Sequence, residues 1–244
     1  MTRVIFVFVW ILAAGAACAA DPPRMFDGAY AKLFAKPFTA SASLTIKRQN
    51  WSRRLGVTVY YLDARRSLAR LTGSQRDLGT VALRSGDRVY LYFPRAELLV
   101  GAPSASASLP LFGSDFAADD LLAFGDLAGR FNVAAETAET LSGLPARRYE
   151  LKPREGKDSP YGLVKLWIAR DGGAPLREEF RSADRNLLRE IVVESDGRLP
   201  LPSLWRARGY GAKGGESELR FVFFDSGRPL DPELFTVAGL RKWR

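Results

Sequence analysis

The stretch Leu111-Phe112-Gly113-Ser114-Asp115-Phe116-Ala117-Ala118-Asp119-Asp120-Leu121 decides how the rest of the chain is interpreted. It separates two series of segments in which apolar and polar residues alternate, and it follows an Ala/Ser-rich strap at residues 101–109. It also opens a segment, residues 119–131, that we expect to be helical. The two aspartates would then lie in the first helical turn, where negative charge interacts favourably with the helix dipole.

Upstream of this stretch the sequence predicts an antiparallel meander. Apolar and polar residues alternate with a period of two in residues 41–49, 55–61, 67–72, 80–83 and 88–93, with short turn-forming spacers between them. Several strands also carry apolar residues on their second face, so we expect both faces of the sheet to be partly covered. These second-face residues are Tyr60, Leu62, Tyr90 and Tyr92.

Downstream a second meander is predicted, over residues 147–152, 163–169, 176–182, 187–194, 203–210 and 218–224. Asp231 and Pro232 fit the N-cap and first position of a short terminal turn. Residues 21–36 place their apolar side chains on one face of an amphipathic helix. With no repeat and no change of composition, residues 21–244 are expected to form a single domain.

The first twenty residues have the layout of a secretory signal peptide. Arg3 precedes an apolar run at residues 4–12, and small residues flank Cys18. The run is shorter than the ~20 residues that span a bilayer. We therefore expect cleavage of residues 1–20 and export to the periplasm. The alternative is lipid anchoring at Cys18, although Gly15 stands where such processing sites usually have leucine.

Composition argues against catalysis and against a metal centre. The chain has no histidine, and Cys18 is its one cysteine, so the cleaved protein would lack the commonest general base, a thiol nucleophile and the commonest metal ligands. No cofactor, metal or catalytic residue is therefore expected. The formal net charge of +9 suits contact with an anionic membrane surface, and arginine-rich genome composition would explain it equally well. Because the arginines are scattered, nucleic-acid binding is not expected.

Two further patterns have simple structural explanations. Gly209-Tyr-Gly211-Ala-Lys-Gly214 matches a dinucleotide-binding fingerprint in spacing, but a strand follows it where a helix would be needed, so we interpret it as a hairpin loop. Glu178 and Glu179 are neighbours on one strand and would point to opposite faces, so they cannot share one acid–base site. A Ser-His-Asp triad is impossible without histidine.

The order of these segments resembles the outer-membrane lipoprotein-sorting family, the relatives of LolA, over about residues 25–240. The resemblance is carried by residues 66–71, 78–83 and 89–94, then by 113–116 and 120–121, and later by 165–168, 175–180 and 231–236. The family pattern has Ser-Tyr-Glu where this chain has Ala117-Ala118-Asp119. The usual capping serine is therefore missing, and Ser114 or Asp115 would have to cap the helix.

This resemblance implies a mainly β (α+β) fold, a curved antiparallel sheet or incomplete β-barrel covered by a few helices around an apolar cavity. It implies a monomeric, non-catalytic carrier that moves a lipid or lipoprotein acyl chain toward the outer membrane. The alternative is a non-catalytic adaptor of an RND-type lipid exporter in the inner membrane. The strap and helix would form a lid that Gly113, Gly125 and Gly129 allow to move. The expected lid motif is Gly113, Ser114, Asp115, Phe116, Asp120 and Leu121, and Arg70 is a candidate arginine to tie it to the sheet.

Surplus apolar positions on the sheet give candidates for the cavity lining. For each such residue, packing in an ordinary core remains the alternative, and only the surplus of the whole set indicates a cavity. The candidates are Trp51, Val57, Val59, Tyr61, Leu83, Val89, Leu91, Phe93, Trp167 and Phe180.

Overall fold

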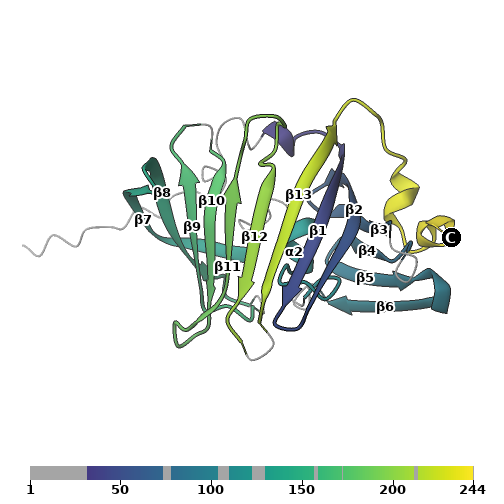
Figure 1. The fold of residues 1–244 in the computed structure, drawn as a ribbon, viewed down its shortest axis with the longest axis horizontal. Coiled ribbons are helices and arrows are strands. Elements are labelled where there is room, and N and C mark those ends of the chain that lie inside the picture. Colours follow the sequence, from purple (N-terminus) through teal and green to yellow (C-terminus); the bar gives the residue numbers. More distant parts are fainter. Residues whose placement is uncertain are drawn as a thin grey trace, which may run out of the picture.

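The protein, in a computed structural model, is built on one antiparallel sheet of thirteen strands. The structure describes residues 32–73, 78–103, 110–122, 130–156, 159–171, 173–211 and 214–243. The strand order is β6-β5-β4-β3-β2-β1-β13-β12-β11-β10-β9-β8-β7 (Figure 1). The first half of the chain therefore forms one side of the sheet and the second half the other, joined where β1 pairs with β13.

The strands run over Phe38–Arg48 (β1), Trp51–Asp63 (β2), Arg66–Thr72 (β3), Val81–Ser85 (β4), Arg88–Phe93 (β5), Leu98–Pro103 (β6), Phe131–Leu141 (β7), Leu144–Pro153 (β8), Leu163–Ala169 (β9), Pro175–Arg181 (β10), Leu187–Glu194 (β11), Leu204–Gly209 (β12) and Glu216–Asp225 (β13). The helical elements are α2 (Ala118–Leu122) and the 3-10 turns η2 (Pro94–Ala96), η4 (Pro232–Phe235) and η5 (Gly239–Trp243).

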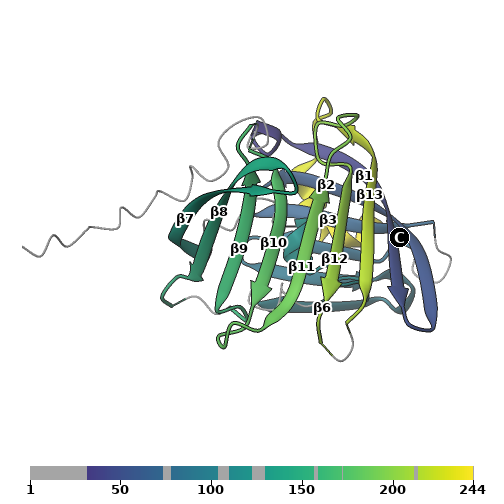
Figure 2. The same cartoon turned by 60° about the vertical axis from the view of Figure 1, so that its left-hand side comes forward.

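The sheet is strongly curved, so that its two halves face each other across an interior (Figures 1 and 2). Bulges between Ser41 and Ala42 in β1 and between Val133 and Ala135 in β7 interrupt the pairing register, and bulges increase the local twist of a strand. β6 and β7 end the strand order at opposite edges, so the sheet does not close. The predicted fold class, a curved antiparallel sheet or incomplete barrel, is confirmed.

The inner face of the sheet carries the main core. Every second residue of β1 from Phe38 to Ile46 is buried, and the register sets it beside the buried residues of β2 from Leu55 to Tyr61. The same cluster continues through β8 to β13 and includes Leu121 and Leu122 of α2. The period-two pattern of the sequence thus places one long apolar surface inside the curve.

The outer face has a second, smaller core over β3, β4 and β5. Leu68, Leu83 and Tyr92 pack there under Phe235 of η4 and Leu240 of η5. Asp231 caps η4, accepting a hydrogen bond from the Glu233 backbone N–H at 2.9 Å, with Pro232 following it. The expectations that both faces are partly covered and that Asp231 caps a terminal turn are confirmed.

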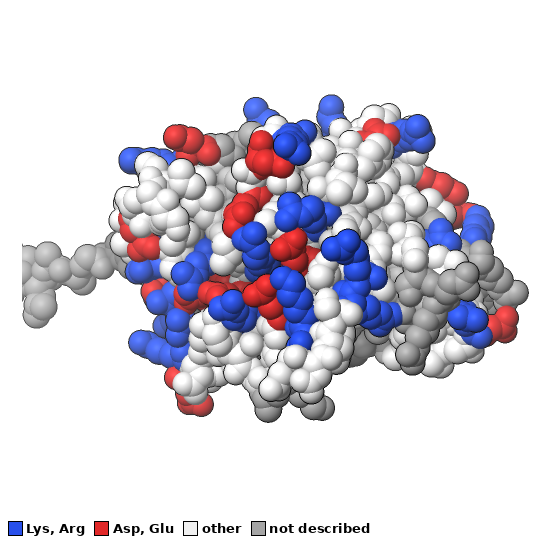
Figure 3. All heavy atoms as spheres, viewed as in Figure 1, with Lys and Arg blue, Asp and Glu red and all other residues white. Residues whose placement is uncertain are grey.

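The rest of the outer face, over β8 to β13, is covered by paired charges. Figure 3 shows basic and acidic side chains interspersed across it. Glu179 bonds Arg177 at 2.8 Å and Arg181 at 2.7 Å, and similar pairs join Arg206 to Glu194 and Arg208 to Glu216. Because the charges largely cancel, this face is no basic stripe of the kind that binds nucleic acid.

Three details differ from the sequence-based predictions. The strands β6 and β7 were not predicted, because Leu98-Leu99-Val100 has no alternation and most of β7 is exposed. The helix predicted over residues 119–131 is wrong at its last residue, since Phe131 begins β7; residues 123–129 lie outside the described part of the chain.

Some predicted features lie outside the described residues. These are the signal peptide, residues 21–31 of the amphipathic helix, and Gly125 and Gly129 of the lid. From the end of the amphipathic helix, Leu33 and Phe34 pack against the inner core. No helix in the described ranges is long and apolar enough to cross a membrane.

Candidate functional site

Residues 110–122, which we call the cover segment, lie inside the curve of the sheet and connect its two halves. The segment turns sharply at Phe112 and Gly113, which have φ angles of 55° and 74°. The Ser114 hydroxyl holds this turn by donating to the Leu111 carbonyl at 2.6 Å and accepting from the Phe116 N–H at 3.2 Å. The left-handed conformation at residue 113 explains the glycine.

Asp120 caps the start of α2, because its carboxylate accepts a hydrogen bond from the backbone N–H of Ala117 at 2.7 Å. This departs from the prediction that Ser114 or Asp115 would provide the cap. Ser114 is engaged in its own turn, and the Asp115 side chain points toward the sheet. Asp120 lies within the helix and reaches back, which a search for a preceding cap residue would not find.

Asp115 fixes the cover segment to the junction of the two halves. Its carboxylate accepts from Arg48 Nη1 at 2.8 Å, from the Ser217 hydroxyl at 2.6 Å and from the Gly215 N–H at 3.1 Å. Arg48 Nη2 also donates to the Gly113 carbonyl at 3.0 Å. The Asp115 side chain is only 5% exposed, so this is a buried, fully bonded carboxylate.

The glycine-rich loop between β12 and β13 permits this contact, and its prediction as a hairpin loop is confirmed. A Cβ atom on Gly215 would lie 2.4 Å from Arg48 Nη1, and one on Gly209 would lie 3.1 Å from Asp115 Oδ1. The glycines therefore let the hairpin approach the Arg48–Asp115 pair closely.

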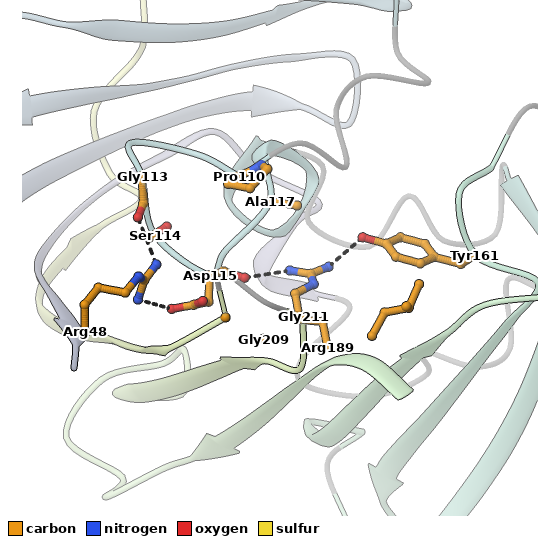
Figure 4. Close-up of a pocket in the computed structure, with 12 residues that line it drawn as sticks. Arg48, Pro110, Gly113, Ser114, Asp115, Ala117, Tyr161, Arg189, Gly209 and Gly211 are labelled. Atoms are coloured by element: carbon orange, nitrogen blue, oxygen red, sulfur yellow. Dashed lines mark hydrogen bonds and ion pairs between the residues drawn. The ribbon is translucent and has the colours of Figure 1, made fainter. Parts of the chain in front are cut away.

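A second pair ties α2 to the other half of the sheet. Arg189 of β11 donates to both carboxylate oxygens of Asp120. It also donates to the Tyr161 hydroxyl at 3.3 Å (Figure 4). Its guanidinium lies 4.1 Å from the Phe180 ring centroid. Burial lowers the pKa of Arg189, but Asp120, Tyr161 and Glu178 together raise it above its ordinary value, so the guanidinium remains charged. Burial raises the pKa of Tyr161.

Two further carboxyl groups extend this interior charge cluster. Asp119 pairs with Arg130 and lies 3.8 Å from Arg84. Burial raises the pKa of Asp119 above its ordinary value in spite of these two arginines. Burial, with a smaller contribution from Asp120, raises the pKa of Glu178 to about 7.

Arg70, the candidate tie for the lid, is on the wrong face of the sheet. It alternates along β3 with Ala69 and Leu71, which belong to the inner core, and shares its side with Leu68 of the outer core. The arginines that bind the cover segment are Arg48, Arg84 and Arg189, together with Arg130 beside it. The sequence contains many arginines, and only the alternation within each strand separates inward from outward ones.

A pocket of about 490 Å³ opens beside the cover segment. Arg48, the 113–117 turn and the glycine-rich loop form its outer walls, and Tyr161 and Arg189 form its inner wall (Figure 4). Its volume is within the ~300–1,000 Å³ that is typical of small-molecule sites.

The predicted lining residues divide between three places. Val57, Val59, Tyr61, Val89 and Phe180 are buried in the inner core, where Leu91 packs partly buried against them. Phe93 follows Leu91 on the same side of β5 and is partly buried. None of these residues lines the 490 Å³ pocket.

Three of the candidates lie away from the inner face. Leu83 belongs to the outer core. Trp167 also faces outward, with its indole N–H bonded to Glu139 and Arg177 5.4 Å from its ring centroid. Trp51 is 51% exposed at the end of the β1–β2 hairpin, where the Arg48 guanidinium is 5.8 Å from its ring centroid. Leu83 and Trp167 each stand next to an inward-facing residue, so an error of one position in assigning the faces misplaced them.

Arg48, Tyr161 and Arg189 were not predicted from the sequence as site residues. Arg189 carried a usable signal, because it alternates with Ile191 and Val193 and a charged residue among inward apolar positions requires a buried partner. The separation of Glu178 and Glu179 onto opposite faces is confirmed. No group of three or more metal-binding side chains occurs among the residues that the structure describes.

Comparison with known proteins places this geometry in a family. A family model described as "-like: Uncharacterized protein" matches residues 63–242. The chain belongs to this family, and its fold is LolA-like. Among curated proteins, none matches the sequence.

Three solved structures show the LolA-like fold. A LolA superfamily protein from Nitrosomonas europaea is 17% identical with a TM-score of 0.73, covering 91% of this chain and 100% of its own. A Vibrio parahaemolyticus domain described as an outer membrane lipoprotein-sorting protein is 18% identical with a TM-score of 0.76, covering 90% and 95%. A DUF1329 family protein from Desulfovibrio piger is 16% identical with a TM-score of 0.73, covering 90% and 99%.

Proposed function

We propose that the protein is an exported, non-catalytic carrier that binds a lipid or lipoprotein acyl chain inside the curved sheet and moves it toward the outer membrane. The observation that supports this most is the contrast between the inner face and its cover. The inner face is mainly apolar across both halves of the sheet, whereas the described part of its cover is a short segment that combines a few apolar contacts with ion pairs and hydrogen bonds.

This construction suits reversible opening. An acyl chain that replaced α2 against the inner core would remove its own apolar surface from water, worth about 25 cal/mol per Å². The charged groups released from the cover segment could then be solvated by water. The cover segment would exchange with cargo. In the empty protein, Leu121 and Leu122 would occupy the space that the acyl chain takes in the loaded protein.

The interior carboxyl groups do not favour an enzyme. Asp119 and Asp120 are held by arginines, and the charged neighbours of Glu178 are Asp120, Arg189 and Arg130. We infer a binding role for the interior and a structural role for these groups. Residues 1–20 would direct export, after which the chain acts as a periplasmic monomer.

The second candidate is an adaptor of an RND-type exporter in the inner membrane. The observation that favours it is the exposed apolar edge of the sheet, where Leu98, Leu99 and Val100 are 41–51% exposed. Such a strand can contact another protein. A pull-down from membranes at moderate salt would retain the transporter with an adaptor and not with a free carrier.

The test is native mass spectrometry of the mature protein purified from periplasm without detergent. We expect a bound acyl species in the wild type and its loss in Leu91→Gln, which alters a partly buried residue of the inner face. Leu144→Gln is the matched control, because Leu144 is 53% exposed at the β7–β8 turn. Val59 is unsuitable, since it is fully buried and a polar group there would unfold the protein.

A wild-type protein that carries no acyl species and takes none up from liposomes would contradict the carrier proposal and favour the adaptor. Equal lipid content in Leu91→Gln and Leu144→Gln would place the chain somewhere other than the inner face.

A further inference from the structure

The 490 Å³ pocket has a composition that the acyl chain itself does not need. An apolar chain requires only apolar walls, yet this pocket is lined by two arginines, a carboxylate and the backbone of three loop glycines. It opens to solvent beside the cover segment, while its inner wall includes Tyr161 and Ala117, which are buried in the protein interior. It therefore extends from the surface to the edge of the inner core.

The ionic groups at the pocket form two pairs, Arg48 with Asp115 and Arg189 with Asp120 behind the inner wall. Asp115 is the one acidic residue among those that line it, and its carboxylate oxygens already accept from Arg48, Ser217 and Gly215. Because both guanidinium groups are paired, an anion entering the pocket would be recognised by unused N–H donors and not by an excess of positive charge.

Arg48 retains the capacity to bind such an anion. A guanidinium has five N–H donors. Arg48 uses both donors of Nη1, toward the Lys47 carbonyl and Asp115, and one of Nη2, toward the Gly113 carbonyl. Nε and the second Nη2 donor have no protein acceptor among the described residues. The Arg48 side chain is 17% exposed, so these donors belong to a group that solvent or a ligand can reach.

We propose that this pocket binds the anionic headgroup, a phosphate or a carboxylate, of the lipid whose acyl chain the inner face holds. The inference rests on the proposed carrier function and specifies its cargo as a negatively charged amphiphile. The headgroup would bind to Arg48 and the loop backbone, and the chain would pass Tyr161 and Ala117 toward the core.

The surroundings of the pocket agree with this assignment. Trp51 lies against Arg48, and Leu188 and Tyr210 are joined by a backbone hydrogen bond of 2.9 Å on the other side of the pocket. These three side chains are 51%, 39% and 46% exposed. A mouth of exposed aromatic and aliphatic side chains beside arginine is suited to an amphiphile that leaves or enters a lipid interface.

A larger side chain at Gly211 would fill the pocket without altering the residues proposed to bind the headgroup. Gly211 lines the pocket, a Cβ atom there would meet nothing within 4 Å, and its backbone is outside the left-handed region. Gly211→Phe should therefore occupy the headgroup space without changing Arg48, Asp115 or the cover segment. Gly211→Ala adds a single methyl group and is the matched control, and thermal unfolding would verify that both variants fold like the wild type.

The experiment measures binding of three amphiphiles with the same acyl chain, below their micelle concentrations, to delipidated protein. Lysophosphatidylglycerol and the free fatty acid are anionic, and monoacylglycerol is neutral. We expect the wild type and Gly211→Ala to bind both anionic ligands about tenfold more tightly than the neutral one, the size of a charge-assisted hydrogen bond. Gly211→Phe should lose this preference while it still binds monoacylglycerol.

Equal binding of all three ligands by the wild type, or an unchanged preference in Gly211→Phe, would overturn the headgroup site and leave the carrier proposal standing. No binding of any ligand would overturn both. Inorganic phosphate serves as a competitor. Displacement of lysophosphatidylglycerol by millimolar phosphate would identify a site for free anions and would also overturn the assignment to a lipid headgroup.

Discussion

Asp115 and Arg48 show how much a single buried ion pair can organise. The pair fixes a turn of the cover segment, the end of β1 and the β12–β13 loop at once. Removing one partner of a buried pair leaves the other charge without compensation, which costs far more than losing a pair at the surface.

We predict that Asp115→Asn lowers the free energy of unfolding by about 3 kcal/mol, since Arg48 would lose its carboxylate partner. Asp87→Asn is the matched control, because the Arg65–Asp87 pair is 65% and 80% exposed and should contribute about 0.5 kcal/mol or less. Urea denaturation of the two variants measures the difference. A similar decrease in the free energy of unfolding in both variants would show that the Asp115 contacts contribute little to the stability of the fold.

Glu178 predicts a pH dependence of stability. Its pKa is about 7 in the folded protein, above its ordinary value of 4.5. Between these two values the unfolded chain has released the proton and the folded protein keeps it. Stability should therefore fall as the pH rises from about 4.5 to 7 and level off above, by on the order of 2 kcal/mol after allowance for solvent screening.

Glu178→Gln should remove this fall in stability. The free energy of unfolding of the variant should therefore rise relative to that of the wild type as the pH increases. Urea denaturation at pH 5 and pH 8 measures it, and Glu179→Gln, on the outer face of the same strand, is the control. Parallel profiles for the wild type and Glu178→Gln would contradict the burial of the Glu178 carboxyl among Asp120, Arg189 and Arg130.

At the scale of elements, the two edge strands differ sharply. β7 carries Glu136 and Glu139 and a bulge at Val133 and Ala135, devices that discourage pairing with another chain. β6 has no charged residue and exposes three consecutive apolar side chains. The protected and the unprotected edge lie at opposite ends of the same sheet.

We predict that Leu99→Lys reduces self-association at high concentration and leaves stability within about 0.5 kcal/mol, because a surface charge on an edge blocks strand pairing. Val222→Lys is the control, since Val222 is 65% exposed on β13, which has neighbours on both sides. Light scattering against concentration measures the effect. An equal reduction in both variants would point to general surface hydrophobicity.

For the whole molecule, the relevant property is net charge. The outer face pairs its charges locally, yet the chain has a formal charge of +9. We predict that the mature protein sediments with phosphatidylglycerol vesicles and not with phosphatidylcholine vesicles. Raising the salt from about 0.15 M to 1 M should abolish binding, since the screening length falls from about 8 Å to about 3 Å. Salt-independent binding, or equal binding to neutral vesicles, would contradict this electrostatic contact.

Most of the sheet could be predicted because its signal is local. Alternation in residues 55–61 or 187–194 reports directly which side of a strand is buried, so eleven of the thirteen strands were found. Where alternation is absent, as at Leu98-Leu99-Val100, or where the strand is exposed on both sides, as in β7, this signal fails.

The sequence by itself therefore determined the class of fold, the hairpin role of the glycine-rich loop and the separation of Glu178 from Glu179. These follow from the period of two and from turn chemistry, which act between neighbours. Only the tertiary structure decided that Arg48 meets Asp115 and that Arg189 meets Asp120, across separations of 67 and 69 residues. Alternation within the strands separates Arg48 and Arg189 from Arg70, but nothing local identifies their partners. Their roles come from the curvature of the sheet, which brings its two halves together around the cover segment.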